Sequence, residues 1–216
     1  MKMLARSFMI ALMVCTPLVI TAPASAQLFG VGKFKVQQSD DRFSTDGSTT
    51  YSGLNNRVSK RSVAGGTHID GKGMFVEPVA IARKADKAII ALSLFIHNET
   101  DFDTAYGAPN SIGVPQRITF LADSGPPIVL IVSNSDRKWS DVPTYNTFSR
   151  SASSRISETG FADLTAEQFH RIASASVLVV RIEGSVRSVV YEAKDISKSF
   201  IPNLLAFYST YVMVTP

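Results

Sequence analysis

The sequence predicts a mainly β protein, either an antiparallel β-sandwich or a strongly curved sheet, with two helices late in the chain. Roughly nine segments have strand character, and turn-forming residues separate them. Only two segments have helical spacing, and both follow residue 160. This order differs from the alternation of strands and helices that builds a parallel sheet.

The first 26 residues are typical of a bacterial signal peptide. Lys2 and Arg6 precede an apolar run over residues 7–20, and Ala24 and Ala26 occupy the small-residue positions read by a signal peptidase. We expect cleavage after Ala26, a periplasmic or secreted location, and no stable membrane insertion afterwards.

Cleavage would change the charge and the redox chemistry of the chain. The 22 Lys and Arg residues fall by two, leaving a net charge of +2 against 18 Asp and Glu, and Cys15, the single cysteine, is lost. A hydrophobic core rather than disulfides must then hold the fold. The basic residues are scattered, so we expect no nucleic-acid partner.

Residues 27–56 are expected to be a loosely ordered segment, followed by one β-rich domain over residues 57–216. The segment contains one plausible strand, residues 33–38. The remainder is rich in Ser, Thr, Asp, Asn and Gly, which favour turns, and this predicts a long loop or a frayed edge.

The middle of the chain consists of predicted strands. Pro78 removes a hydrogen-bond donor, so its strand is expected to lie at an edge or to bend there. Residues 88–97 are apolar on both faces and are expected to form the central buried strand. The predicted strands of this region are residues 57–63, 74–83, 88–97, 116–123, 128–133 and 145–156.

The two helices are predicted from capping and periodicity. Thr165 and Gln168 have the spacing of a capping box, and Leu164 and Phe169 that of a hydrophobic staple. A hairpin over residues 177–182 and 186–192 follows. Apolar residues then recur at helical spacing over residues 200–212, with Pro202 in the first turn, where proline is tolerated.

A glycine-rich stretch, AGGTHIDGKGMF, spans residues 64–75. It does not fit the dinucleotide-binding pattern, because the next segment is a strand rather than a helix. His68 and Asp70 stand two residues apart and could supply half of a metal site. The simpler interpretation is a flexible connection between strands.

Glu99, Asp101 and Asp103 could offer oxygen ligands to Ca²⁺. An EF-hand loop beginning at Asp101 fails, because Tyr106 and Ile112 stand at its sixth and twelfth positions. These acids and the pair His68 and Asp70 are therefore weak metal candidates only, and we expect no metal and no organic cofactor.

Partner-binding candidates are aromatic residues and one arginine. Trp139, the single tryptophan, lies among polar residues, and Tyr145 and Phe148 could form an aromatic patch with it. Packing over the end of the sheet is the alternative for Trp139. Arg181 lies in an apolar hairpin, where it could hold a ligand carboxylate or pair with Glu183 or Glu192.

We expect a non-enzymatic binding or accessory protein of the bacterial envelope, whose partner is another envelope protein or a small ligand. No nucleophile elbow is present, and the mature chain has no cysteine. One alternative is a periplasmic hydrolase with a site built from loop residues such as His68, Asp70 and Asp101. Another is a structural subunit of an envelope assembly, with an edge strand that a partner completes.

Three stretches carry a resemblance: residues 41–51, the helix that begins with LTAEQ at Leu164, and the strand VLVVRIEG from Val177. Together they resemble a loose set of small exported bacterial β-rich proteins. The resemblance implies export and a β-rich fold, and it implies no activity and no site residues.

Overall fold

One large antiparallel sheet forms most of the protein, and the sheet does not close on itself. The computed structural model describes residues 32–41, 47–67, 72–140 and 143–213. The sheet order is β1-β2-β3-β4-β8-β6-β5-β9-β10, with β7 paired to β8. The strands are β1 (Lys35–Asp41), β2 (Ser48–Leu54), β3 (Gly73–Arg83), β4 (Ile89–Asp103), β5 (Pro115–Ala122), β6 (Ile128–Trp139), β7 (Thr144–Asn146), β8 (Ser151–Asp163), β9 (Leu178–Gly184) and β10 (Ser188–Tyr191).

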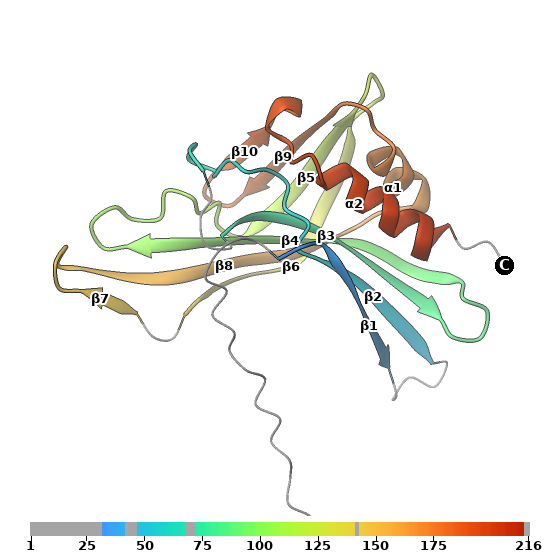
Figure 1. Cartoon of the computed structure of the whole chain (residues 1–216), viewed down its shortest axis with the longest axis horizontal. Helices are drawn as coiled ribbons and strands as arrows, with labels where there is room; N and C mark the ends of the chain where they lie inside the picture. The colour runs from blue at the N-terminus through green and yellow to red at the C-terminus, as the bar shows by residue number, and fades with distance from the viewer. Residues whose placement is uncertain (1–31, 42–46, 68–71, 141–142, 214–216) are drawn as a thin grey trace, which may run out of the picture.

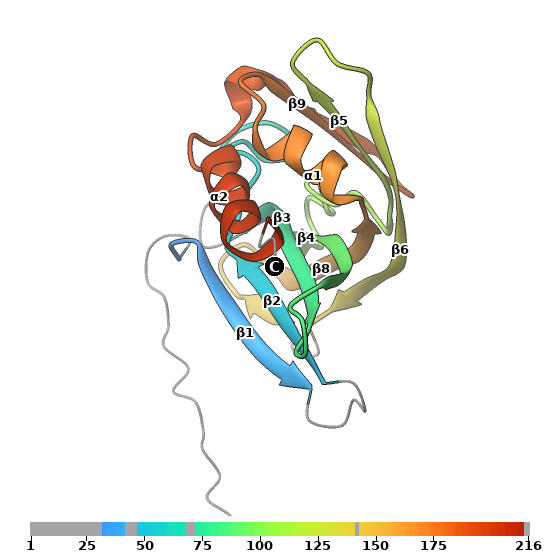
Figure 2. The ribbon, with the colours of Figure 1, turned by 90° about the vertical axis from the view of Figure 1, so that its right-hand side faces the viewer.

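The sheet is strongly curved, and the two helices fill its hollow side. Helices α1 (Ala166–Ala173) and α2 (Phe200–Phe207) lie between the β1–β4 half and the wall formed by β5, β6 and β9 (Figures 1 and 2). Side chains from both halves of the sheet and from both helices share one hydrophobic core. The predicted curved antiparallel sheet with late helices is confirmed.

Two strands lie within the segment that the sequence predicts to be loose. β1 pairs with β2 from Lys35↔Leu54 to Asp41↔Ser48, and β2 pairs with β3. The expectation of a loop over residues 48–54 is therefore wrong, because cross-strand pairing stabilises a Ser- and Thr-rich strand that has little local preference. Residues 57–63 form isolated bridges instead of the predicted strand.

Pro78 lies in an interior strand, contrary to the edge position expected for β3. β3 pairs with both β2 and β4. The ladder with β2 ends at Val79, the residue that follows Pro78 in the chain, so β3 is unpaired with β2 at Pro78, where proline lacks its donor. A Cβ on the facing Gly53 would lie 2.8 Å from the Pro78 ring.

The sheet bends where β6 changes partner. Residues 128–131 of β6 pair with β5, and residues 132–139 pair with β8, with a bulge between Ser133 and Asp136. Gly160 of β8 faces this bulge, and a Cβ there would lie 2.4 Å from Cγ1 of Val132. A bulge and a glycine together let a strand bend sharply.

The predicted strand 145–156 is a hairpin rather than one strand. β7 and β8 pair from Thr144↔Ser153 to Asn146↔Ser151. The Asn146 side chain accepts hydrogen bonds from the backbone N–H groups of Phe148 and Ser149, which fixes the turn. With the ends of β4 and β6, this hairpin projects beyond the core (Figure 1). We call residues 99–107, 136–140 and 143–157 the arm.

Both predicted helices are present. Thr165 Oγ1 accepts from Gln168 N at 3.1 Å, and Gln168 Oε1 accepts from Thr165 N at 2.9 Å, so the predicted capping box is confirmed. The second predicted helix consists of α2 followed by a π-helical turn, η2 (Tyr208–Val212), and a short 3-10 turn, η1 (Ala193–Asp195), precedes it. None of the helices within the described ranges is long and apolar enough to cross a membrane.

Candidate functional site

The acidic candidates line a pocket beside the end of β4. β3 begins at Gly73, opposite Glu99, so residues 100–102 of β4 extend beyond the described end of β3, and Asp103 forms a bridge with Gly107. The pocket measures about 430 Å³, and its lining includes Glu99, Asp101, Asp103 and Lys72. The structure thus brings together three of the five metal candidates, whereas His68 and Asp70 lie outside the described residues.

The three acids are already engaged with protein groups. Asp101 forms an ion pair with Lys72. Asp103 accepts from Ser151 Oγ at 3.0 Å and from Ala105 N at 2.7 Å, which closes the turn after β4. Within the described part of the chain, no three His, Cys, Asp or Glu side chains are placed to hold a metal ion.

His97 and Glu99 form a pair on the surface of β4 that faces away from the helices. His97 Nε2 lies 2.6 Å from Glu99 Oε1, and the rings of Phe75 and Phe95 flank the imidazole at 5.8 and 5.7 Å. Burial acts to raise the pKa of Glu99, but hydrogen bonds from His97 and Ser157 and the charges of His97 and Arg155 outweigh it and lower the pKa.

The hydroxyl group nearest to this pair in the strand register is not placed for nucleophilic catalysis. Ser157 stands opposite Glu99 in the sheet, and among the described residues the His97 imidazole is hydrogen bonded to Glu99 and to no hydroxyl group. A serine nucleophile needs the imidazole next to its hydroxyl to take the proton. The geometry therefore suits a structural pair within β4, which Arg155 Nε of the neighbouring β8 approaches at 3.8 Å from Glu99 Oε2.

Glu158, which the sequence analysis did not single out, is completely buried on β8. Its carboxylate accepts hydrogen bonds from Asn98 Nδ2 at 2.8 Å, from the backbone N–H groups of Ile112 and Gly113 at 2.9 Å each, and from Ser111 Oγ. Arg137 Nε lies 3.3 Å away. Only the fold places these donors around one carboxylate, and the sequence contains no local signal for it.

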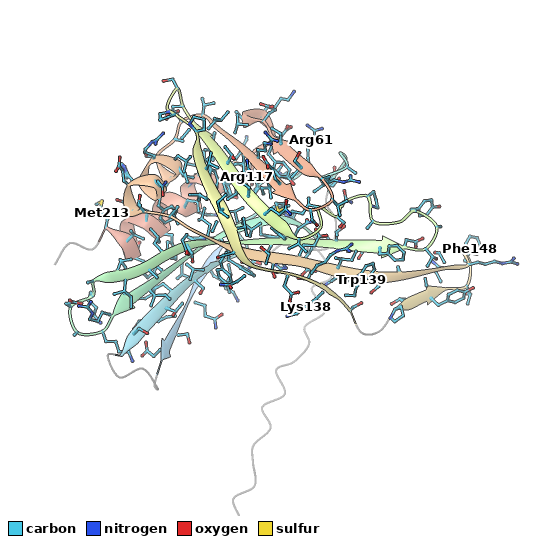
Figure 3. The ribbon with its side chains drawn as sticks, turned by 180° about the vertical axis from the view of Figure 1, so that it is seen from behind. Arg61, Arg117, Lys138, Trp139, Phe148 and Met213 are labelled. Atoms are coloured by element: carbon cyan, nitrogen blue, oxygen red, sulfur yellow. The ribbon has the colours of Figure 1, made fainter. Side chains whose placement is uncertain are left out.

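The predicted aromatic patch is dispersed along the arm. The Trp139 ring packs edge-on against Phe102 at 5.2 Å and lies under the Arg137 guanidinium, so this tryptophan packs over the sheet and is 45% exposed. Tyr145 and Phe148 are 61% and 99% exposed. Figure 3 shows Phe148 at the outer end of the arm and Trp139 closer to the core.

A fourth exposed aromatic residue, Tyr106, joins this end of the arm. Ala152 of β8 pairs with Tyr145 of β7. The Ala152 carbonyl accepts a hydrogen bond from the backbone N–H of Thr104, which follows β4 on the opposite side of β8. The turn that carries Tyr106 therefore lies across β8 from β7, and Tyr106 is 82% exposed. The sequence did not predict Tyr106 as part of an aromatic patch, because the acidic residues that precede it are typical of a turn or a cation site.

Arg181 lies on the outer surface of β9, apart from the arm. Its Nε lies 3.0 Å from Glu183 Oε1, which is one of the two ion pairs expected from the sequence. Arg117 of the adjacent β5 also approaches Glu183, at 3.6 Å. Arg181 and Glu192 line a shallow groove of about 350 Å³ with Leu121 and Val190.

Comparison with protein-family models, with curated proteins and with solved structures finds no significant match for this chain. Function is therefore inferred from the geometry of the chain itself.

Proposed function

We propose that this chain is an exported, non-enzymatic binding protein of the bacterial envelope, which holds a protein partner at the outer end of its arm. The observation that supports this most is the exposure of three aromatic side chains at one end of a projecting sheet. Phe148 is 99% exposed, Tyr106 82% and Tyr145 61%.

Exposed aromatic rings of this kind favour association. Burying the ring of Phe148 against a partner would remove apolar surface from water, which is favourable. Tyrosine rings offer large contact area with few rotatable bonds, and aromatic side chains frequently dominate the energetics of interfaces. These three side chains do not pack in the hydrophobic core and lie beyond it on the arm.

The backbone that carries the rings is well anchored. Asn146 holds the turn before β8, and Ser151 Oγ donates to Asp103 Oδ2 at 3.0 Å, joining the two turns at the end of the arm. Thr104 Oγ1 accepts from Ala152 N at 3.0 Å. An anchored surface loses little conformational entropy on binding, which supports affinity.

Hydrolysis is less well supported by the same geometry. Asp101 is paired with Lys72, and the described residues include no hydroxyl group hydrogen bonded to the imidazole of His97, whose Nε2 lies 2.6 Å from Glu99 Oε1. His170, the other described histidine, packs its ring 5.1 Å from the ring of Tyr208 at the helix pair.

Site-specific photocrosslinking in the native bacterium tests the proposal. A benzophenone amino acid replaces Phe148 or Tyr106 in the full-length gene, and the matched control replaces Val186, which is 64% exposed in the turn between β9 and β10. We expect one defined adduct with an envelope protein from positions 148 and 106, and none from position 186. Mass spectrometry of the purified adduct identifies the partner and shows whether the mature chain begins at Gln27.

Absence of any adduct at positions 106 and 148 would contradict the proposal, as would the same adduct pattern at position 186. A Phe148→Ala chain with unchanged thermal unfolding should compete at least about tenfold less well for the purified partner, as expected for an aromatic anchor.

A further inference from the structure

A pocket of about 480 Å³ lies where the chain enters α2, and its described lining is basic. Three cationic side chains, Lys33, Arg57 and Lys60, line it together with the polar residues Ser197, Ser199 and Asn203. No Asp or Glu occurs among the lining residues that the structure describes. Lys33 lies two residues before β1, whereas Arg57 and Lys60 lie in the connection between β2 and β3, so the fold and not the sequence gathers them.

Within the described ranges, none of these three cations forms an ion pair with a carboxylate. By contrast, Arg61, the next residue after Lys60, forms an ion pair with Asp195, with Nη1 2.9 Å from Oδ1. The nearby Glu77 is buried in the sheet, where its Oε1 accepts from Asn55 N at 2.6 Å. The pocket therefore keeps an excess of positive charge that protein carboxylates do not neutralise.

Arg57 is the most constrained of the three cations. Its guanidinium lies over the Phe75 ring at 5.3 Å, and Nη2 donates to the Lys72 carbonyl at 2.6 Å. Its Nε is buried without a hydrogen-bond partner in the described part of the chain. Burial lowers the pKa of Arg57 from its ordinary value, because the charge has lost water without gaining a carboxylate.

The walls of the pocket are joined by hydrogen bonds across distant segments. Ser197 N donates to Val58 O at 2.8 Å, and Val58 N donates to Met74 O at 2.9 Å. Asn203 Nδ2 donates to Asn56 Oδ1 at 3.0 Å, and this bond joins α2 to the segment between β2 and β3. A pocket held in this way needs little rearrangement to receive a ligand.

Hydroxyl groups complete the polar lining. Ser197 Oγ and Ser199 Oγ lie 3.2 Å apart. Ser199 precedes the first residue of α2 and makes no side-chain capping bond, and the first turn of α2 contains no acidic residue. The positive end of the helix dipole adds to the attraction that the three cations exert on an anion.

We propose that this pocket binds a phosphate-bearing anion, either a phosphorylated small molecule or the phosphate of a lipid headgroup. Several oxygens on one phosphorus atom can accept from lysine, arginine and serine donors at the same time, which a single carboxylate does less completely. The pocket shares no residue with the arm, so this inference goes beyond the proposed function and does not depend on it.

Calorimetric titration of the mature protein with inorganic phosphate at low salt tests the site. We expect saturable binding at one site, weakened at least about tenfold in the Lys33→Gln/Lys60→Gln double variant, because each lost lysine removes a charge-assisted hydrogen bond. The matched control, Lys87→Gln/Lys138→Gln, removes the same charge outside the pocket and should bind within about twofold of wild type. Thermal unfolding of both variants checks the fold.

Sedimentation with vesicles distinguishes the two sources of phosphate. Binding to phosphatidylglycerol vesicles, competed by free phosphate and lost in Lys33→Gln/Lys60→Gln, would assign the site to lipid headgroups. Phosphate binding without vesicle binding would assign it to soluble ligands. Failure to bind either probe overturns the proposal, and so does binding that both double variants lose equally or that neither loses.

Discussion

Asn98 of β4 and Glu158 of β8 stand directly opposite each other in the sheet, and both side chains are completely buried. Asn98 Nδ2 donates to Glu158 Oε2 at 2.8 Å and to the Asn110 carbonyl at 2.9 Å. The loop after β4 is thereby bonded to two neighbouring strands at once. A buried carboxylate with this many donors anchors a segment that has few hydrogen bonds of its own.

Glu158→Ala should destabilise the protein by about 3–5 kcal/mol, because the substitution leaves buried donors and the Arg137 charge without their acceptor. The free energy of unfolding from urea denaturation measures the loss. Glu192→Ala, at an exposed position, serves as the control and should change stability by less than about 0.5 kcal/mol. Equal stability of the two variants would show that the Glu158 network contributes nothing.

Glu77 should make stability depend on pH. Burial raises the pKa of its carboxyl, although hydrogen bonds from Asn55 and Asn56 and the charge of His97 act in the opposite direction. A raised pKa in the folded state favours folding below the unfolded pKa and loses that contribution as pH rises through the folded pKa.

Glu77→Gln keeps an acceptor for Asn55 N and removes the titration. We therefore expect the stability of the variant minus that of wild type to be larger at pH 7 than at pH 4. The difference in urea midpoint at each pH measures it. A stability difference that is the same at both pH values would contradict the assigned pKa shift.

The hydroxyl of Tyr191 is buried in the core and has no hydrogen-bond partner among the described residues. Burial also raises its pKa. Tyr191→Phe should stabilise the protein by about 1 kcal/mol, because it removes a polar group that has lost water without gaining a bond. Tyr145→Phe, with an exposed ring, should leave the unfolding temperature unchanged. A Tyr191→Phe variant that is less stable than wild type would contradict the prediction that the buried hydroxyl destabilises the folded state.

Thr165→Ala should cost about 1 kcal/mol, because the first turn of α1 loses the oxygen that accepts from Gln168 N. Thr165→Ser retains the oxygen and should restore most of the stability in thermal unfolding. If the serine variant unfolds like the alanine variant, the methyl group of threonine, and not its hydroxyl, stabilises this helix end.

Local patterns predicted much of the fold. The capping box at Thr165, the turn after β5 and the hairpin of β9 and β10 depend on residues close together in the chain, and all three are present. β2 and the turn between β7 and β8 were missed, since a polar strand is stabilised by its neighbours rather than by its own composition.

The candidate sites were less predictable, because each joins distant residues. Glu99, Asp101 and Asp103 share one pocket because they alternate along β4, which runs to Asp103 and not, as predicted, only to residue 97. Arg57 and Ser197 line one pocket only because the connection after β2 and the entry to α2 are hydrogen bonded to each other. Trp139 and Phe148 are nine positions apart in the chain, yet one packs on the sheet and the other faces water.

The sequence by itself determined the sheet-dominated class, the two late helices and the start of the first helix, because these depend on alternation, periodicity and capping within short windows. The tertiary structure alone decided the curvature of the sheet, the anchoring of the loop by Glu158 and the grouping of cations beside α2. Those features arise from strand register and from contacts between distant segments. Polar interactions become stronger where the folded chain buries them away from water.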